Sequence, residues 1–138
     1  MTTRIKDAFK LVPAGIKAMM ALEASINASG LETSLLELVR LRASQINGCA
    51  FCIHMLDAWR ESPLFTDRER AALNWTESLT RIAKTHAPDA DYAMLQAQFN
   101  ETEIAYLTLL IGSINLWNRV QIALRWTHPV EAPAAAAA

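Results

Sequence analysis

The sequence predicts an all-α protein with a single domain. Three observations support this fold class. The 138-residue chain has only 4 Gly and 5 Pro, apolar residues recur at helical spacing along most of it, and no stretch alternates apolar and polar residues as a half-buried strand does. Hydrophobic residues make up 52% and charged residues 20% of the chain, which is typical of a folded core. We expect the domain to span residues 1–128 and a disordered Ala/Pro tail to follow over 129–138.

Three helices are expected in the first half of the chain. The first spans 10–27, with Pro13 in its first turn, where the missing N–H group leaves no hydrogen bond unmade. The second spans 34–46, and Asn47-Gly48 is a helix-ending signal. A third helix is expected from about Cys49 to Trp59.

Three more helices are expected in the second half. Thr66 and Glu69 form a capping box that begins a helix reaching about Lys84, and a short helix follows over 90–99. Asn100 begins the last helix, which runs over 103–126 and is apolar almost all round in its first half. Such a helix is either central to the core or a subunit contact. The inward positions expected on the helix over 67–84 are Ala72, Trp75, Leu79 and Ile82.

Composition and charge exclude several classes of function. The formal net charge of −1 gives no electrostatic basis for binding nucleic acid or an anionic membrane. The N-terminus has no continuous apolar stretch of the secretory type. The longest uncharged apolar run, 104–117, is shorter than the ~20 residues that a bilayer requires. We therefore expect a cytoplasmic protein, in which thiols stay mostly reduced.

The only two cysteines, Cys49 and Cys52, are separated by two residues. In a reducing compartment this spacing favours a catalytic or metal-binding pair over a structural disulfide. A helix N-terminus at Cys49 would favour its thiolate, which attacks a peroxide or a disulfide, and the second thiol then resolves the product. The alternatives are a zinc site that includes His54, although no second Cys-x-x-Cys is present, and two inert buried thiols. We favour redox chemistry.

Two further side chains are candidates for moving protons. Glu37 lies three residues after Ser34, so its carboxylate either caps a helix N-terminus in a capping box or relays protons to the thiols. Along one straight helix Glu37 and Cys49 would lie ~18 Å apart, so a relay requires the chain to reverse at Asn47-Gly48, and the spacing alone favours the cap. His54 either delivers protons near neutral pH or is a packing or surface histidine, which the spacing slightly favours.

The segment from Glu37 to Cys52 resembles the signature of the AhpD-like alkylhydroperoxidase family, within the carboxymuconolactone decarboxylase superfamily. The segments over 67–77 and 114–119 also look like that family, and the resemblance extends from about Val12 to Trp126. It implies an all-helical domain that assembles into dimers, trimers or hexamers. It also implies a thiol-dependent peroxidase that reduces hydroperoxides, is recharged by a dithiol or thioredoxin-like donor, and needs no cofactor or metal.

The resemblance also assigns roles to individual residues. Cys52 matches the peroxidatic cysteine that becomes a sulfenic acid, Cys49 matches its disulfide partner, and Glu37 matches the relay acid. This assignment differs from the dipole argument, which would activate Cys49. We follow the family, because Glu37 and local burial can override the dipole.

The chain departs from the family pattern after the cysteines. The motif continues Cys-x-x-Cys-x-x-x-His, and here Leu56 occupies the histidine position. Relatives also carry well over ten further residues, a helix and a turn, between the positions of Met55 and Leu56. Either the gene carries a deletion, which leaves His54 as the only nearby substitute, or a segment is missing from this sequence.

Two other functions remain open at this point. One is a lyase or isomerase like the decarboxylase branch, which does not need paired cysteines. The other is a non-catalytic redox-sensing or assembly module, which would form a reversible disulfide without turnover.

Overall fold

The computed structural model describes residues 2–48 and 59–126, and within these ranges all regular structure is helical. The predicted all-α fold is confirmed. The helix expected over 49–59, except for its last residue, and the tail over 129–138 lie outside the described residues. The helices are α1 (Ala8–Leu11), α2 (Pro13–Asn27), α3 (Thr33–Ile46), α4 (Asp67–Thr80), α5 (Ile82–Thr85), α6 (Asp89–Gln96) and α7 (Glu101–Leu124).

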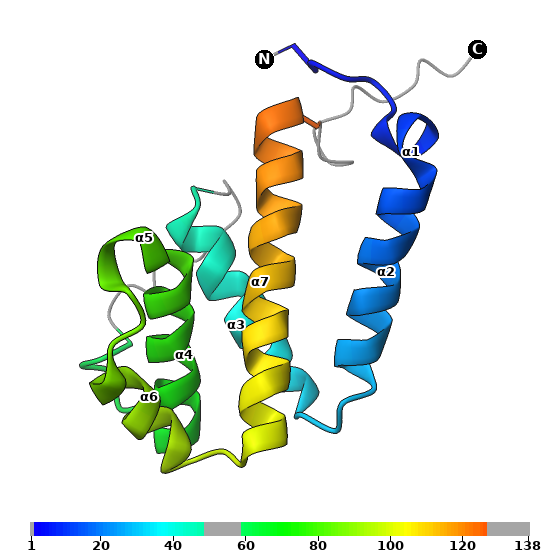
Figure 1. Cartoon of the computed structure of the whole chain (residues 1–138). Coiled ribbons are helices and arrows are strands. Elements are labelled where there is room, and N and C mark those ends of the chain that lie inside the picture. Colours follow the sequence, from blue (N-terminus) through cyan, green and yellow to red (C-terminus); the bar gives the residue numbers. More distant parts are fainter. Residues whose placement is uncertain (1, 49–58, 127–138) are drawn as a thin grey trace.

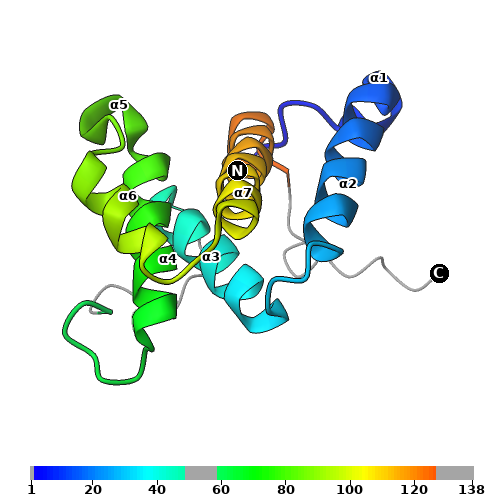
Figure 2. The same cartoon turned by 60° about the horizontal axis from the view of Figure 1, so that its bottom comes forward.

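The long helix α7 lies in the middle of the molecule (Figure 1). Helix α2 packs on one side of it, and α3 and α4 pack on the other, with α5 and α6 beyond α4 (Figure 2). Helix α3 contacts both α4 and α7. No helix in these two ranges is long and apolar enough to cross a bilayer.

Local sequence signals fix the starts of the two longest helices in the second half of the chain. The Thr66 hydroxyl accepts a hydrogen bond from the N–H of Glu69 at 3.1 Å, and the Glu69 carboxylate accepts one from the N–H of Thr66 at 2.9 Å. Asn100 and Glu103 form the same reciprocal pair at the start of α7. These side chains satisfy N–H groups that have no partner within the helix, so both predicted starts are confirmed.

Two expected helices are interrupted. The helix predicted over 10–27 breaks at Val12 (φ −130°), because the ring of Pro13 disfavours helical geometry at the residue before it. The helix predicted over 67–84 breaks at Arg81 (φ −108°). The prediction that Ile82 points inward is therefore wrong. This residue starts the short helix α5, and it is 53% exposed.

One apolar core holds the helices together. It joins the first half of α7 to α2, α3, α4 and α6, and Trp75 also donates to Thr108 Oγ1 at 3.1 Å. In the second half of α7 the buried side chains are instead polar, and this change positions the candidate site. The largest members of the core are Ile26, Leu31, Leu35, Leu36, Val39, Trp75, Leu95, Phe99, Ile104, Leu107, Leu110 and Ile111.

A buried carboxylate ties α3 and α4 to the chain that follows residue 58. Glu77 on α4 is 8% exposed. It accepts hydrogen bonds from Arg42 on α3, from Trp59 Nε1 at 2.8 Å and from Arg60 Nη1 at 2.6 Å. The guanidinium of Arg60 also lies 4.3 Å from the ring centre of Trp59. These bonds compensate the cost of removing the charge from water.

The electrostatics of this cluster favour the ionised acid. Burial alone would raise the pKa of the Glu77 carboxyl, but the donors Trp59, Arg60 and Arg42 outweigh it and lower the pKa below its usual value of 4.5. A lowered pKa in the folded state stabilises the fold above pH 4.5. That contribution is lost as pH falls below 4.5 through the folded-state pKa.

We expect Glu77→Gln to lower the free energy of unfolding at pH 7 by about 3–5 kcal/mol, because the substitution removes the buried charge to which Arg42, Trp59 and Arg60 all donate. The difference from wild type should shrink below pH 4.5, where the wild-type carboxyl also loses its charge. Urea unfolding at pH 7 and at pH 3.5 measures both effects. Glu101→Gln, at an exposed glutamate in the first turn of α7, is the matched control and should change neither value. An unfolding free energy of Glu77→Gln equal to that of wild type at pH 7 would contradict this account.

Candidate functional site

Helix α3 ends directly before the cysteine pair. Asn47 is its C-terminal cap, and Gly48 follows with φ +79°. A residue with a side chain is strained at this φ, so glycine fits the position. The predicted turn at Asn47-Gly48 is confirmed. Cys49, Cys52 and His54 lie outside the described residues, so their predicted roles stay predictions.

Glu37 lies on α3, and its predicted role as a helix cap is wrong. The helix starts at Thr33 with Glu32 as its N-terminal cap and without a side-chain capping bond, so Ser34 is already inside the helix. The Glu37 carboxylate instead accepts from Arg40 Nη1 at 2.7 Å, and its side chain is 67% exposed. The helical rise from Glu37 to Ile46 is about 13.5 Å, so a relay to the thiols still depends on how the chain runs after Gly48.

Arg40 connects Glu37 to α2 and α7. Its Nη2 donates to Glu23 Oε2 at 2.7 Å and to Asn27 Oδ1 at 2.8 Å. Glu23 in turn accepts from Ser113 Oγ on α7 at 2.5 Å. The relay candidate is therefore one member of a polar network that joins three helices.

Two polar pairs join α3 to α7 at the end that leads to the cysteines. Ser44 Oγ donates to Asn118 Oδ1 at 3.2 Å, and Asn47 Nδ2 donates to Asn115 Oδ1 at 3.0 Å. On each helix the two bonding positions are three residues apart. Buried amides need such partners, so these bonds fix the position at which α3 ends against α7.

Asn115 uses its hydrogen-bonding groups fully. Besides accepting from Asn47, its Oδ1 accepts from Arg119 Nη1 at 3.3 Å. Its Nδ2 donates to the carbonyl oxygen of Ile111 at 2.8 Å and to Thr80 Oγ1 at 3.1 Å. Because an amide has two donors and two acceptor lone pairs, Asn115 has a structural role in this arrangement.

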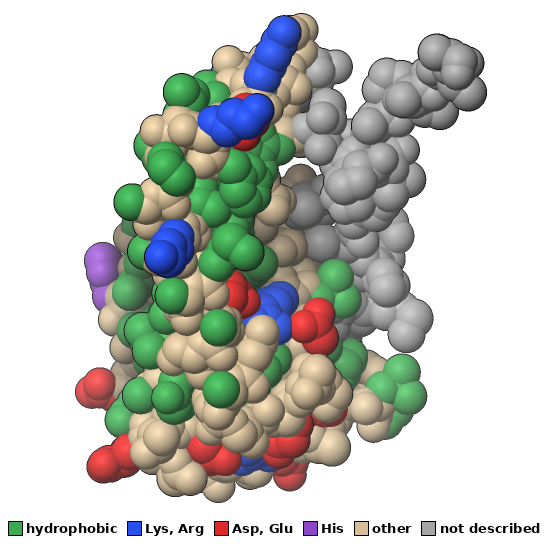
Figure 3. Space-filling view, turned by 90° about the vertical axis from the view of Figure 1, so that its right-hand side faces the viewer, with side chains coloured by type: hydrophobic (Ala, Val, Ile, Leu, Met, Phe, Trp, Pro, Cys, Tyr) green, Lys and Arg blue, Asp and Glu red, His purple; other side chains and the backbone are tan. Residues whose placement is uncertain are grey.

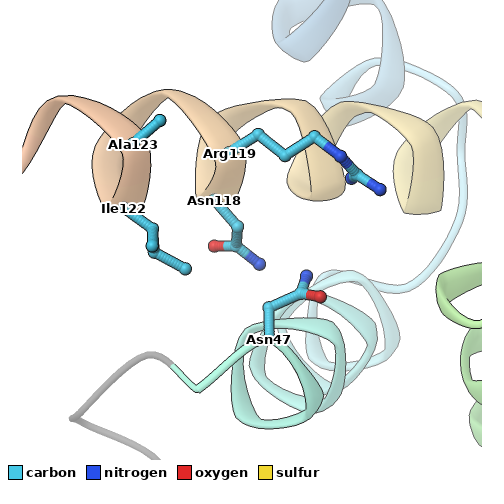
Figure 4. A pocket seen from close by; sticks show the side chains of 5 residues that line it. All are labelled: Asn47, Asn118, Arg119, Ile122 and Ala123. Carbon is cyan, nitrogen blue, oxygen red and sulfur yellow. The ribbon is translucent and has the colours of Figure 1, made fainter.

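A pocket of about 310 Å³ opens between the end of α3 and the C-terminal half of α7 (Figure 4). In Figure 4 the side chain of Asn118 points from α7 toward α3, and that of Asn47 lies opposite. The pocket thus combines two amides and one guanidinium with an apolar wall. Its lining residues are Asn47, Asn118, Arg119, Ile122 and Ala123.

Both ends of the segment over 49–58 are anchored to described helices. Asn47 holds the upstream end to α7, and Trp59 and Arg60 hold the downstream end to Glu77 on α4. Arg42, on α3, shares that carboxylate.

Sequence reasoning missed Arg42, Glu77, Asn115 and Asn118. Arg119 donates to the carbonyl oxygen of Asn115 at 3.0 Å and lines the pocket. One signal was available: Asn115 and Asn118 are amides one helical turn apart in an otherwise apolar helix, and such residues face either solvent or a polar partner.

Comparisons with known proteins identify the family. Residues 13–57 match the model of the carboxymuconolactone decarboxylase family. The uncharacterized protein YdfG of Bacillus subtilis is 34% identical over 133 residues, with 84% of this chain and 90% of YdfG covered. The uncharacterized protein YnjA of Escherichia coli is 32% identical over 113 residues, with 70% of this chain and 62% of YnjA covered.

These alignments also bear on the predicted missing segment. The alignment with YdfG has 133 positions and covers 84% of this 138-residue chain, which is about 116 residues. About 17 positions of the alignment therefore have no counterpart in this chain. For YnjA, 70% is about 97 residues of 113 positions, so about 16 have none. Both numbers agree with a missing helix and turn, although the expected junction, Met55–Leu56, lies outside the described residues.

Solved structures share the fold. A protein of unknown function from Agrobacterium tumefaciens, which has been proposed to be the antioxidant defence protein AhpD, superposes with a TM-score of 0.84 at 44% identity. The superposition covers 94% of this chain and 100% of that one. An uncharacterized peroxidase-related protein from Silicibacter sp. TM1040 has a TM-score of 0.68 at 23% identity over 83% of this chain and 71% of its own, which shows a shared fold alone. This chain belongs to the carboxymuconolactone decarboxylase family, in its AhpD-like branch.

Proposed function

We propose that the protein is a thiol-dependent peroxidase that reduces hydroperoxides through Cys49 and Cys52. One observation carries the proposal: in a chain of the AhpD-like branch, the paired cysteines follow Glu37 at the spacing Glu-x11-Cys-x-x-Cys. A lone Cys-x-x-Cys would be much less specific. The decarboxylase branch does not need the pair, and its presence favours redox chemistry.

The proposed cycle has three balanced steps. The Cys52 thiolate attacks the outer oxygen of a hydroperoxide, the O–O bond breaks, and the alkoxide takes a proton to leave as an alcohol while Cys52 becomes a sulfenic acid. The Cys49 thiol then displaces that oxygen as water and forms the disulfide. A dithiol or thioredoxin-like donor supplies two electrons and two protons, which restore both thiols and leave the donor as its own disulfide.

The end of α3 supports this chemistry. Cys49 is two residues beyond Asn47, and consecutive Cα atoms are about 3.8 Å apart, so chain connectivity keeps Cys49 close to the pocket beside Asn47. A hydroperoxide in that pocket would meet amide donors, one guanidinium and an apolar wall. Sites for small organic molecules typically combine an apolar lining with a few polar groups.

Proton transfer is assigned to Glu37 and His54. Glu37 bonds Arg40 at 2.7 Å and is 67% exposed, and a carboxylate can accept a proton from a thiol. His54 replaces the family histidine, whose position is occupied here by Leu56, and an imidazole exchanges protons near neutral pH.

We also infer that the chain forms a homo-oligomer through α7 and α2. Ala105, Leu109, Gly112 and Leu116 are exposed at i, i+4, i+7 and i+11 of α7, the spacing of a helix-pairing stripe. Figure 3 shows apolar side chains recurring on the side of the molecule seen there, and Met20 on α2 is one of the exposed large hydrophobic residues. A second copy would remove this apolar stripe from water.

Cys52→Ser should abolish hydroperoxide consumption, because no sulfenic acid can form at residue 52. In wild type, one equivalent of hydroperoxide should remove two titratable thiols per chain, whereas Cys49→Ser should stop at a sulfenic acid that dimedone traps. Thiol titration and intact mass measure these states. Loss of no thiols in wild type, or full turnover in Cys52→Ser, would refute the cycle.

Glu37→Gln should slow the reaction of the reduced protein with hydroperoxide about 100-fold, because general acid–base groups typically contribute 10²–10⁴-fold. The stopped-flow rate at pH 7 measures this loss, with Glu101→Gln as the matched exposed control. Equal rates in Glu37→Gln and wild type would remove Glu37 from the mechanism.

Leu109→Glu combined with Leu116→Glu should dissociate the oligomer, because the two side chains are 48% and 43% exposed in the single chain and charges in an apolar interface are costly. Light scattering coupled to size exclusion gives the mass. Lys84→Glu, at an exposed position of α5 outside the proposed contact, is the control. A wild-type mass of one chain would show that the stripe is not a contact between copies.

A further inference from the structure

Asn118 is a buried amide whose donor is left without a protein partner. The residue is 3% exposed, and its Oδ1 accepts from Ser44 Oγ at 3.2 Å. Its Nδ2 is buried and has no hydrogen-bond partner in the structure as described. A buried donor without a partner is destabilising, so a site that retains one is suited to a ligand that completes the bond.

Comparison with Asn115 shows that the open donor is specific to one position. Both amides are buried on α7, one turn apart, and each bonds a polar side chain of α3. The Nδ2 of Asn115 is satisfied by Thr80 and the carbonyl oxygen of Ile111. Of these two α7 amides, Asn118 is the one that lines the pocket and whose Nδ2 has no partner, and in Figure 4 its side chain points into the space between α7 and α3.

The surroundings of Asn118 define the chemistry of the ligand. An N–H donor requires an acceptor, and oxygen is the usual one. Ile122 and Ala123 provide an apolar wall beside it, and the guanidinium of Arg119 favours negative charge in the pocket. These features suit a small molecule with an oxygen at one end and a hydrocarbon body.

We propose that Asn118 Nδ2 is the substrate-binding donor of this pocket and holds an organic hydroperoxide by its carbon-bound oxygen. The inference rests on the proposed peroxidase function and adds the residue that orients the substrate. When a thiolate takes the outer oxygen, the O–O electron pair passes to the carbon-bound oxygen, which becomes an alkoxide before it is protonated. A hydrogen bond to that oxygen strengthens as the charge develops.

The first test measures binding without turnover. The alcohol 2-phenyl-2-propanol carries the same oxygen as cumene hydroperoxide but cannot be reduced, and isopropylbenzene lacks the oxygen. In wild type the alcohol should shift the NMR signals of the Asn118 side-chain amide and bind more tightly than the hydrocarbon. Asn118→Asp, which replaces the donor with an acceptor, should weaken alcohol binding about tenfold, the equivalent of one hydrogen bond. Gln121→Ala, at an exposed position one turn further along α7, is the matched control.

A second variant keeps the test valid if Asn118→Asp does not fold. Ile122→Trp fills the pocket from its exposed side and leaves Asn118 intact, so it should also abolish the amide shift. Unchanged alcohol affinity in either folded variant, or equal affinity of wild type for the alcohol and the hydrocarbon, would overturn the assignment.

Steady-state kinetics separate this inference from the function on which it rests. Asn118→Ala should raise KM for cumene hydroperoxide about tenfold and change kcat/KM for hydrogen peroxide much less, because hydrogen peroxide has no hydrocarbon body to place against Ile122. If wild type binds the alcohol but consumes no hydroperoxide, the proposed peroxidase function is refuted, whereas the role of the pocket in binding is supported. Active wild type with an unchanged Asn118→Ala variant would refute the role of Asn118 and retain the peroxidase.

Discussion

The contact between α3 and α7 is the constraint on which the site depends. Its first part is apolar, where Val39 and Leu110 belong to one buried cluster, and hydrophobic burial there supplies most of the stabilisation. Its second part is polar, where Ser44 and Asn47 meet two amides of α7. Because a buried amide without a partner is costly, the polar part fixes where α3 ends. The cysteines follow three and six residues after Ile46, so this contact also determines where their segment begins.

The described residues on either side of the segment over 49–58 are held by two different kinds of contact. Upstream, the neutral side-chain amides of Asn47 and Asn115 form a hydrogen bond. Downstream, the charged cluster at Glu77 holds Trp59 and Arg60. Replacing Glu77 would remove the acceptor that Arg42, Trp59 and Arg60 share, so this cluster depends on that carboxylate. The segment over 49–58, which carries the proposed redox pair, therefore lies between these two contacts.

The sequence resemblance predicts that the length of this segment is where the chain differs from its relatives. About 16–17 aligned positions of YdfG and YnjA have no counterpart here, and the sequence resemblance expects the difference after Met55. The same resemblance expects a relay histidine at the position of Leu56. The described helices nevertheless superpose on the protein from A. tumefaciens with a TM-score of 0.84. Since the packing of α2, α3, α4 and α7 involves contacts outside this segment, the scaffold does not require the missing residues.

The sequence by itself determined the all-α class, the capping boxes at Thr66 and Asn100, and the turn at Asn47-Gly48. These features are local, because a cap or a turn depends on side chains within three or four residues. The cysteine spacing and the resemblance pointed to the family before any contact was known. Only the tertiary structure decided that Glu37 bonds Arg40 instead of capping a helix, that Arg42 and Glu77 form a buried pair, and that Asn118 lines a pocket. Each of these depends on which helix faces meet, and side chains 35 or 74 residues apart in the sequence carry no local signal of that meeting.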